Sequence, residues 1–187
     1  MEKKTIGLLF IIVVLLLFSG CSNGKQAKIK TINHVDTGVL RKSAGTYVGD
    51  ASKDREIIRH LAGGETLKTI DLTGQSMKII YGHKEGGVFS EEEINEYWFN
   101  GKDRALKNFY FNGIYLTLLV PNAKGYSLQV NESRLSLSRD KMVSVLSRHF
   151  SDFPQGEKSW DKKAVSHFIH TNESKIKEMA VHYKQYF

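Results

Sequence analysis

The segment Asp103–Val120 reads DRALKNFYFNGIYLTLLV and is followed by Pro121 and Asn122, which end it. Apolar residues recur in it at close to helical spacing, namely at Leu106, Phe109, Gly113, Leu116 and Val120. Apolar side chains also fill most positions between these in the second half, so we expect a central helix that is buried. A strand over residues 114–120 is the alternative that the same run allows.

The sequence before this segment predicts a helix followed by a β-hairpin. Asp50 is a suitable N-cap for the helix, and Gly63 is suited to end it. Residues 66–72 and 76–81 have the composition of two short strands. The intervening Thr73-Gly74-Gln75 predicts the turn of a hairpin.

A capping box at Ser90 and Glu93 predicts a second helix, running through Tyr97 and Trp98. Three successive glutamates, Glu91–Glu93, invite interpretation as a metal site. Carboxylates in a first helical turn stabilise the positive end of the helix dipole, and this is the interpretation we favour.

After the central segment, the sequence predicts two strands and two more helices. Residues 126–130 alternate as a strand does, and residues 134–137 are expected to pair with them. A helix is expected from Ser138, and a last one from about Ser159. The apolar stripe of the last helix is Val165, Phe168, Ile169, Ile176, Met179, Ala180 and Tyr183.

These elements predict an α+β fold, with a small antiparallel sheet from hairpins packed against three or four helices and a C-terminal helix. Residues 46–153 are expected to form the globular domain. Residues 154–187 are expected to form a helix that packs on this domain or extends it.

Residues 1–20 have the pattern of a bacterial lipoprotein signal peptide. Lys3 and Lys4 precede the apolar segment Ile6–Phe18, whose 13 residues span about 20 Å as a helix. This is short for a hydrocarbon core of about 30 Å. Ser19 and Gly20 then precede Cys21, so we expect cleavage between Gly20 and Cys21 and lipidation of the Cys21 thiol. An ordinary secretory signal, or an uncleaved anchor with an incidental cysteine, is the alternative.

Lipidation of Cys21 implies a protein anchored to the outer face of the cell membrane. Two or more acyl chains hold a protein stably on a bilayer. Residues 21–45 are mainly polar, and we expect them to form a flexible tether. Cys21 is the only cysteine, so the domain contains no disulfide bond.

The formal net charge of the chain is +7. In a cytosolic protein this charge would suggest nucleic acid as a partner. Outside the membrane an anionic lipid or wall polymer is the natural counterpart, and no nucleic-acid partner is expected. The alternative is that scattered lysines serve solubility alone. One mild basic enrichment lies in the expected tether, at Lys25, Lys28, Lys30, Arg41 and Lys42.

Four short motifs, in this order, resemble a known family: Tyr47-Val48-Gly49-Asp50, Ile79-Ile80-Tyr81, Pro121-Asn122 and Ser138-Arg139. The chain is similar over about residues 46–153 to an uncharacterised extracytoplasmic domain family of Gram-positive lipoproteins. The same domain is attached to membrane peptidases of the β-lactamase-regulator type. The resemblance implies an α+β fold and an outward-facing location, and it implies no catalytic residues.

The densest group of candidate ligands lies in the last helix. Histidines three positions apart on a helix are neighbours, so His167 and His170 with Glu173 form a candidate zinc site. Glu178 and His182 follow farther along. Because Glu173 lies farther round the helix and no His-Glu-x-x-His motif is present, we favour a solvated polar face.

Other candidates for chemistry are weaker. Two further pairs of candidate ligands are His34 with Asp36 and His149 with Asp152. We expect the first to bind nothing and the second to contact a helix end. Four Ser-x-x-Lys pairs occur, a small excess over the number expected by chance, at Ser22/Lys25, Ser138/Lys141, Ser159/Lys162 and Ser174/Lys177. We therefore predict no catalytic residue, no metal ligand and no cofactor.

Three classes of function stay open. The interpretation that we favour is a lipid-anchored binding or sensing protein of the cell envelope, without catalysis. An envelope hydrolase or metalloenzyme using the His167/His170 region is the second class. The third is a structural subunit that docks on an envelope protein through Trp160, Phe168 and Tyr183. Aromatic residues at 97–99 and 109–111 form either core or a pocket for a peptide or glycan.

Overall fold

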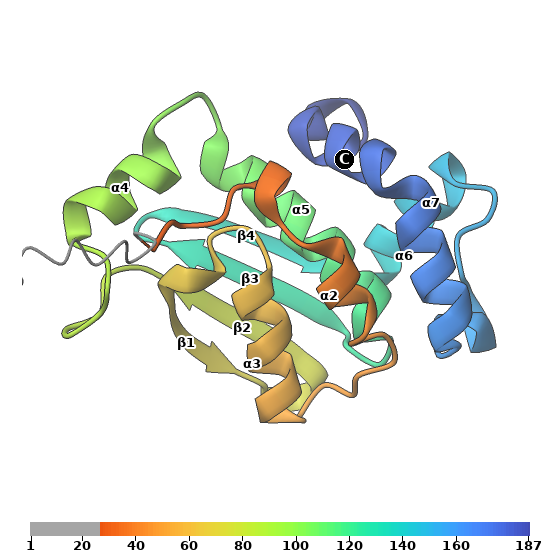
Figure 1. The fold of residues 1–187 in the computed structure, drawn as a ribbon. Helices are drawn as coiled ribbons and strands as arrows, with labels where there is room; N and C mark the ends of the chain where they lie inside the picture. The colour runs from red at the N-terminus through yellow and green to blue at the C-terminus, as the bar shows by residue number, and fades with distance from the viewer. Residues whose placement is uncertain (1–26) are drawn as a thin grey trace, which may run out of the picture.

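The computed structural model describes residues 27–187, so the predicted signal peptide, its cleavage site at Gly20 and Cys21 lie outside the described residues. Four strands form one sheet, and helices gather on one side of it (Figure 1). The predicted α+β class is confirmed; the described part of the chain has six α-helices, where three or four and a C-terminal helix were predicted. The elements are η1 Ile32–His34, α2 Thr37–Arg41, α3 Ala51–His60, η2 Gly64–Thr66, β1 Leu67–Asp71, η3 Thr73–Gln75, β2 Ser76–Tyr81, α4 Glu91–Phe99, α5 Arg104–Leu119, β3 Gly125–Val130, β4 Ser133–Ser138, α6 Arg139–His149, η4 Gly156–Ser159, α7 Lys162–Val181 and η5 Tyr183–Gln185.

The strand order is β1-β2-β3-β4, and the sheet is mixed. The hairpins β1/β2 and β3/β4 are antiparallel, as expected. Between the hairpins β2 and β3 pair in parallel, so the prediction of a purely antiparallel sheet is wrong. The long crossover through α4 and α5 allows this, because parallel neighbours need a connection of a dozen or more residues.

The two faces of the sheet differ in polarity. Side chains of β2 and β3 alternate between buried and more exposed positions, which is the pattern of a sheet covered on one face. The covered face carries Met77, Ile79, Tyr81, Tyr126, Leu128 and Val130. The helices pack on these residues, and the opposite face is open to solvent.

α5 is the central helix of the domain. Phe109, Ile114 and Leu119 are fully buried along its length. The predicted helix over this segment is confirmed, and the strand alternative over residues 114–120 is wrong. α5 contacts β3 and β4 on one side and α4, α6 and α7 on others, which explains why apolar residues occur all round it.

Local signals place most helix starts correctly. Asp50 caps α3 by accepting a hydrogen bond from the Lys53 amide. Ser90 and Glu93 form both bonds of the predicted capping box at α4. Ser138 caps α6, whereas α7 begins at Lys162, after a short 3₁₀ turn around Ser159.

Residues 32–45 belong to the folded domain. They form η1 and α2, and they bury Ile32, Val35, Leu40 and Ala44. α2 packs against α7 (Figure 1). The prediction of a flexible tether is therefore wrong for these residues, because the apolar positions that looked too sparse find a partner surface on a helix more than 100 positions away.

Asp54, in the first turn of α3, is a buried carboxyl group. Its Oδ2 accepts a hydrogen bond of 2.9 Å from the Gly49 amide, while Oδ1 is buried without a partner among the described residues. Burial raises the pKa of Asp54, the Gly49 bond opposes the shift and the nearby Asp50 charge adds to it, so that the pKa is about 6.

Asp54→Asn is expected to flatten the pH dependence of stability. The folded state holds the Asp54 proton to a higher pH than the unfolded state does, so stability falls as pH rises from 3.8 to about 6. The loss amounts to at most about 3 kcal/mol for a shift of about two units. Urea unfolding at pH 4 and pH 7 measures this fall in the free energy of unfolding. Glu132→Gln, at an exposed position, is the control for the loss of one carboxylate. An equal decline in wild type and Asp54→Asn would contradict this assignment.

Candidate anion-binding cleft

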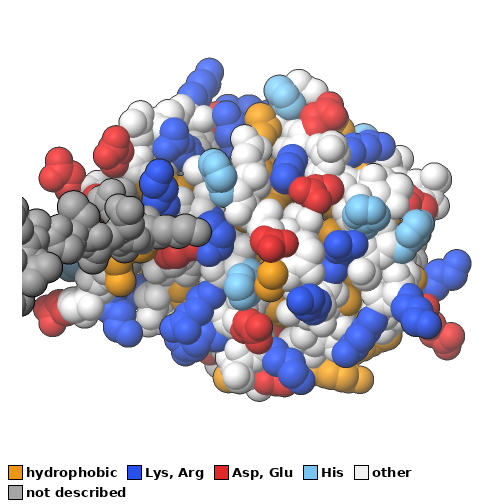
Figure 2. Space-filling model, in the orientation of Figure 1, with side chains coloured by type: hydrophobic (Ala, Val, Ile, Leu, Met, Phe, Trp, Pro, Cys, Tyr) orange, Lys and Arg blue, Asp and Glu red, His pale blue; other side chains and the backbone are white. Residues whose placement is uncertain are grey.

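A basic cleft lies where α2 ends and α7 begins. Its volume is about 580 Å³, and Lys and Arg side chains gather over this part of the surface (Figures 1 and 2). The lining residues are Gly38, Arg41, Lys42, Lys162, Lys163, Ser166, His167 and His170.

The backbone before α3 brings the two halves of the cleft together. Gly45 has a φ of +75°, and a Cβ built on it would lie 3.4 Å from the Trp160 carbonyl oxygen and 3.7 Å from side-chain carbons of Lys162. The ring of Trp160 packs on that of Tyr47, with 4.5 Å between ring centroids. This close approach places the start of α7 beside the end of α2.

The cleft contains no acidic lining residue. Lys42, Lys162 and Lys163 are exposed, and none of them takes part in an ion pair among residues 27–187. Arg41 is half-buried, and its Nε is buried with no hydrogen-bond acceptor in the described part of the chain. Buried donors are nearly always paired in folded proteins, so this N–H points to an acceptor supplied by a ligand or water.

The structure separates the residues of the candidate zinc site. His167 and His170 both line the cleft. Glu173 instead accepts hydrogen bonds from Thr37 and Lys177, and these bonds, led by that from Lys177, hold its pKa below the ordinary value. No group of three or more His, Cys, Asp and Glu residues within the described range is arranged to hold a metal ion. The neighbours of the two histidines are cations, which repel a metal ion.

Such a cleft is suited to bind an anion. A guanidinium group presents planar N–H donors that match the oxygens of phosphate or carboxylate, and lysines add mobile point charges. Several cations close together reinforce each other's attraction for a multiply charged ligand. The geometry therefore supports recognition of an anionic group.

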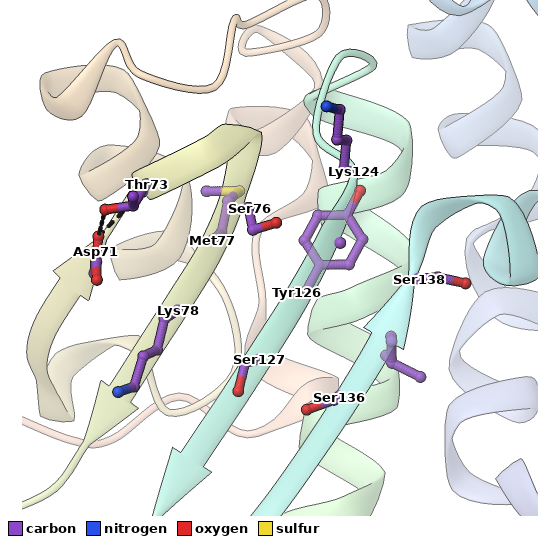
Figure 3. Close-up of a pocket in the computed structure, with 12 residues that line it drawn as sticks. Asp71, Thr73, Ser76, Met77, Lys78, Lys124, Tyr126, Ser127, Ser136 and Ser138 are labelled. Carbon is purple, nitrogen blue, oxygen red and sulfur yellow. Dashed lines mark hydrogen bonds between the residues drawn. The ribbon is translucent and has the colours of Figure 1, made fainter.

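A second hollow lies on the open face of the sheet. It has a volume of about 390 Å³, and Figure 3 shows Lys78 and the hydroxyls of Ser127 and Ser136 along it. Only Lys78 and Lys124 are cationic there, and Asp71 lines the same hollow. Its charge is thus smaller than that of the cleft, and a solvated face is common for sheets with antiparallel edges.

The aromatic residues mainly form the core. Trp98, Phe109 and Phe111 are fully buried, whereas Phe99 is exposed. Two of the three expected docking anchors are also buried: Phe168 packs between Phe150 and Phe153, and Tyr183 packs on Tyr110. The prediction of docking through these two is wrong because they complete the interior; Trp160 is 38% exposed.

The weaker histidine candidates have local roles. Asp36 caps α2, and the His34 ring nitrogen lies 2.8 Å from the Thr31 hydroxyl. The ring of His149 packs edge-on against Tyr186, and Asp152 accepts a hydrogen bond from Asn172. His149 lies in the last turn of α6, at a helix end as expected, whereas Asp152 bonds to Asn172 and not to His149.

The sequence contained part of the signal for the cleft. Arg41 and Lys42 stand out as basic residues, but they fell in the expected tether. Lys162 and Lys163 form an adjacent basic pair in the last helix, with no motif around them that indicates a site. Nothing in the sequence joins the two pairs, because they meet only through the packing of α2 on α7.

None of the helices within residues 27–187 is both long and apolar enough to cross a bilayer.

No curated protein and no solved structure matches the chain. A family model described as a domain of unknown function, DUF4825, matches residues 40–140. The matched segment includes Arg41 and Lys42 and ends before α7, so the cleft forms where the C-terminal helix meets the family domain. The chain belongs to the DUF4825 family.

Proposed function

We propose that this chain is a lipid-anchored binding protein on the outer face of a bacterial, Gram-positive cell membrane, and that the α2–α7 cleft binds an anionic, phosphate-bearing ligand. The role is binding or sensing without catalysis. The ligand chemistry is a phosphate group, carried either by a lipid headgroup or by a wall polymer.

The sequence supports the location. Lys3-Lys4, the short apolar segment Ile6–Phe18 and Ser19-Gly20-Cys21 together form the pattern of a lipoprotein signal. The resemblance to extracytoplasmic lipoprotein domains agrees with this pattern. Intact-mass measurement of the protein from native membranes tests the location: a diacylglyceryl group on Cys21 supports it, and an unmodified thiol with an intact Met1 overturns it.

The observation that carries the ligand class is the excess of positive charge in the lining of the cleft; Glu173, which interacts with Arg41, lies outside the lining. Four Lys or Arg side chains and two imidazoles share one hollow without an acidic neighbour in its lining. At the surface, the attraction between unit charges about 4 Å apart is of the order of 1–4 kcal/mol, so several cations together hold a multivalent anion.

Charge reversal of the cleft is expected to weaken anion binding at least tenfold. The variant is Lys162→Glu with Lys163→Glu in the full chain, which replaces two attractions by two repulsions. Titration calorimetry with a soluble glycerol phosphate oligomer and with inorganic phosphate measures the effect. Flotation with phosphatidylglycerol vesicles, compared with phosphatidylcholine vesicles, tests the lipid-headgroup source.

The matched control is Lys68→Glu with Lys78→Glu, which changes the net charge equally on the exposed sheet. This control is expected to keep the affinity within about twofold, apart from long-range effects that salt screens. Loss of binding in the control alone would move the site to the sheet hollow, and equal affinity in all variants would overturn the proposal.

A further inference from the structure

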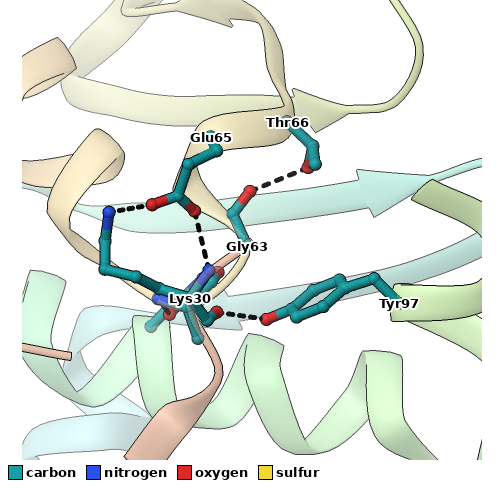
Figure 4. Close-up of polar contacts among 7 residues, drawn as sticks. Lys30, Gly63, Glu65, Thr66 and Tyr97 are labelled. Atoms are coloured by element: carbon teal, nitrogen blue, oxygen red, sulfur yellow. Dashed lines mark hydrogen bonds and ion pairs between the residues drawn. The ribbon is translucent and has the colours of Figure 1, made fainter. Parts of the chain in front are cut away.

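Lys30 fastens the N-terminal segment to the domain. Its amide donates to Glu65 Oε2 at 3.0 Å, and its ammonium group forms an ion pair with Glu65 Oε1. Its carbonyl oxygen accepts hydrogen bonds from the Tyr97 hydroxyl at 2.6 Å and from the Gly63 amide at 2.9 Å (Figure 4). Both main-chain groups and the side chain of Lys30 are thus engaged, and the chain is fixed at this point.

This attachment limits how far the domain can move from a lipid anchor at Cys21. Nine residue steps separate Cys21 from Lys30, and a fully extended chain covers at most about 31 Å in nine steps. A domain of about 160 residues has a radius of gyration of about 15 Å and is therefore about 40 Å across. The tether is shorter than the domain is wide, so the Ala27 side must face the anchor.

The surface around Ala27 has side chains that suit a bilayer interface. Ala27 lines two hollows, one with Val88, Phe89 and Lys84, the other with Phe89 and Tyr97. Val88 is 79% exposed in the loop before α4, just after the turn that the Gly87 amide closes on the Lys84 carbonyl. An exposed apolar side chain near a lysine suits the interfacial region of a bilayer, although the exposed Glu85 lies in the same turn.

The basic cleft lies at the other end of the molecule. Arg104, at the start of α5, lines one of the hollows at Ala27. Thr46, beside the cleft-forming Gly45, donates to the Leu119 carbonyl at the end of α5. α5 has 16 residues, so about 24 Å separate its two ends. Figure 1 shows the same separation, with the first described residues beside α4 and the start of α7 on the far side.

We infer that the end of the domain around Ala27, with the exposed Val88, lies against the outer face of the bilayer, and that the α2–α7 cleft is held away from it. This inference rests on the proposed lipid anchor. Acidic residues Glu93 and Glu96 also line the Ala27 end, so the short tether, and not net charge, keeps this surface at the bilayer. The cleft then faces phosphate groups of the wall and not the headgroups of its own bilayer.

Energy transfer from tryptophan to a dansyl headgroup lipid tests the orientation. The chain has two tryptophans, Trp98 and Trp160, and Trp160 lies beside the cleft. Three proteins are compared on vesicles: wild type, Trp160→Phe, and Val88→Trp with Trp160→Phe. We expect the donor introduced at position 88 to transfer at least threefold more than Trp160 does. Transfer from Trp160 equal to or above that of the introduced donor would overturn the inference.

A longer tether tests whether the length of the tether causes the orientation. Twelve Gly and Ser residues inserted after Gly24 lengthen its reach, and the difference between the two donors should fall at least twofold. An unchanged difference would overturn the role assigned to the tether. Coupling Cys21, the only cysteine, to a maleimide lipid repeats the test on protein that lacks native acylation. A failed orientation is thereby distinguished from a failed assignment of lipidation.

Discussion

Gly63→Ala is expected to destabilise the domain by about 4 kcal/mol. Gly63 has a φ of +73°, where an L-residue costs about 1–2 kcal/mol. A Cβ at this position would also lie 2.3 Å from Cζ2 of Trp98, far inside van der Waals contact. Overpacking a rigid core costs typically about 1–3 kcal/mol, and here the obstructing group is a buried ring. Urea unfolding followed by far-UV circular dichroism measures the sum.

The Trp98 ring cannot move aside without disturbing the core. It is fully buried, and its Nε1 donates to the Thr66 hydroxyl at 3.0 Å. The rings of Tyr81 and Phe109 lie 4.8 Å and 5.5 Å from it. We therefore expect Trp98→Phe, which removes the obstructing atoms, to reduce the additional effect of Gly63→Ala to about 1–2 kcal/mol, the backbone strain alone.

Gly74→Ala is the matched control. Gly74 also has a positive φ, +65°, but a Cβ there would meet no atom within 4 Å. Only the backbone term of about 1–2 kcal/mol is expected. Equal losses for the two glycine variants, or no rescue by Trp98→Phe, would contradict the assigned clash.

Much of the fold could be predicted because its signals are local. The turn at Thr73-Gly74-Gln75 joins β1 to β2, and the capping box at Ser90 starts α4. Each signal acts through hydrogen bonds or dihedral preferences within a few residues, so the sequence around it is sufficient. The apolar density of Asp103–Val120 likewise reflects one helix contacted on several sides.

The features that were missed depend on contacts between distant segments. β2 and β3 pair in parallel. The sequence of each hairpin predicts its own two strands, but it does not predict which strand of one hairpin pairs with which strand of the other. Leu40 looks like an isolated apolar residue in a polar stretch, and it is buried because α2 packs on α7 and α3. Amphipathic pattern reveals that a side chain is apolar, but it does not identify the surface that covers it.

The candidate site depends on the same distant packing. Position 42 and position 162 are 120 apart in the sequence, so the basic cleft has no contiguous motif. The pair His167 and His170 can be recognised in the sequence, but the kind of ligand that it suits depends on the charge of the side chains around it. Beside a carboxylate the pair would suggest a metal site, whereas beside Arg41 and Lys163 it favours an anion.

Asn112 joins three parts of the core through one buried amide. Its Nδ2 donates to the Ala62 carbonyl at 3.0 Å and to the Tyr81 hydroxyl at 3.1 Å, and its Oδ1 accepts from the Ala62 amide at 3.2 Å. It thereby connects α5 to the segment after α3 and to β2. The side chain is fully buried, so no water can replace these bonds without rearrangement.

Asn112→Leu is expected to destabilise the domain by about 4 kcal/mol or more, as measured by urea unfolding. A leucine fits the volume but leaves three buried polar groups without partners, and each such group costs about 1–3 kcal/mol. Asn95→Ala is the control, since this amide accepts one bond from Asn131 at the surface of α4 and its loss should cost about 0.5 kcal/mol or less. If Tyr81→Phe is introduced first, one of the three groups no longer needs a partner, and Asn112→Leu should then cost about 1 kcal/mol less. Additive losses in this double-mutant cycle would show that the Asn112–Tyr81 bond contributes nothing to the stability of the core.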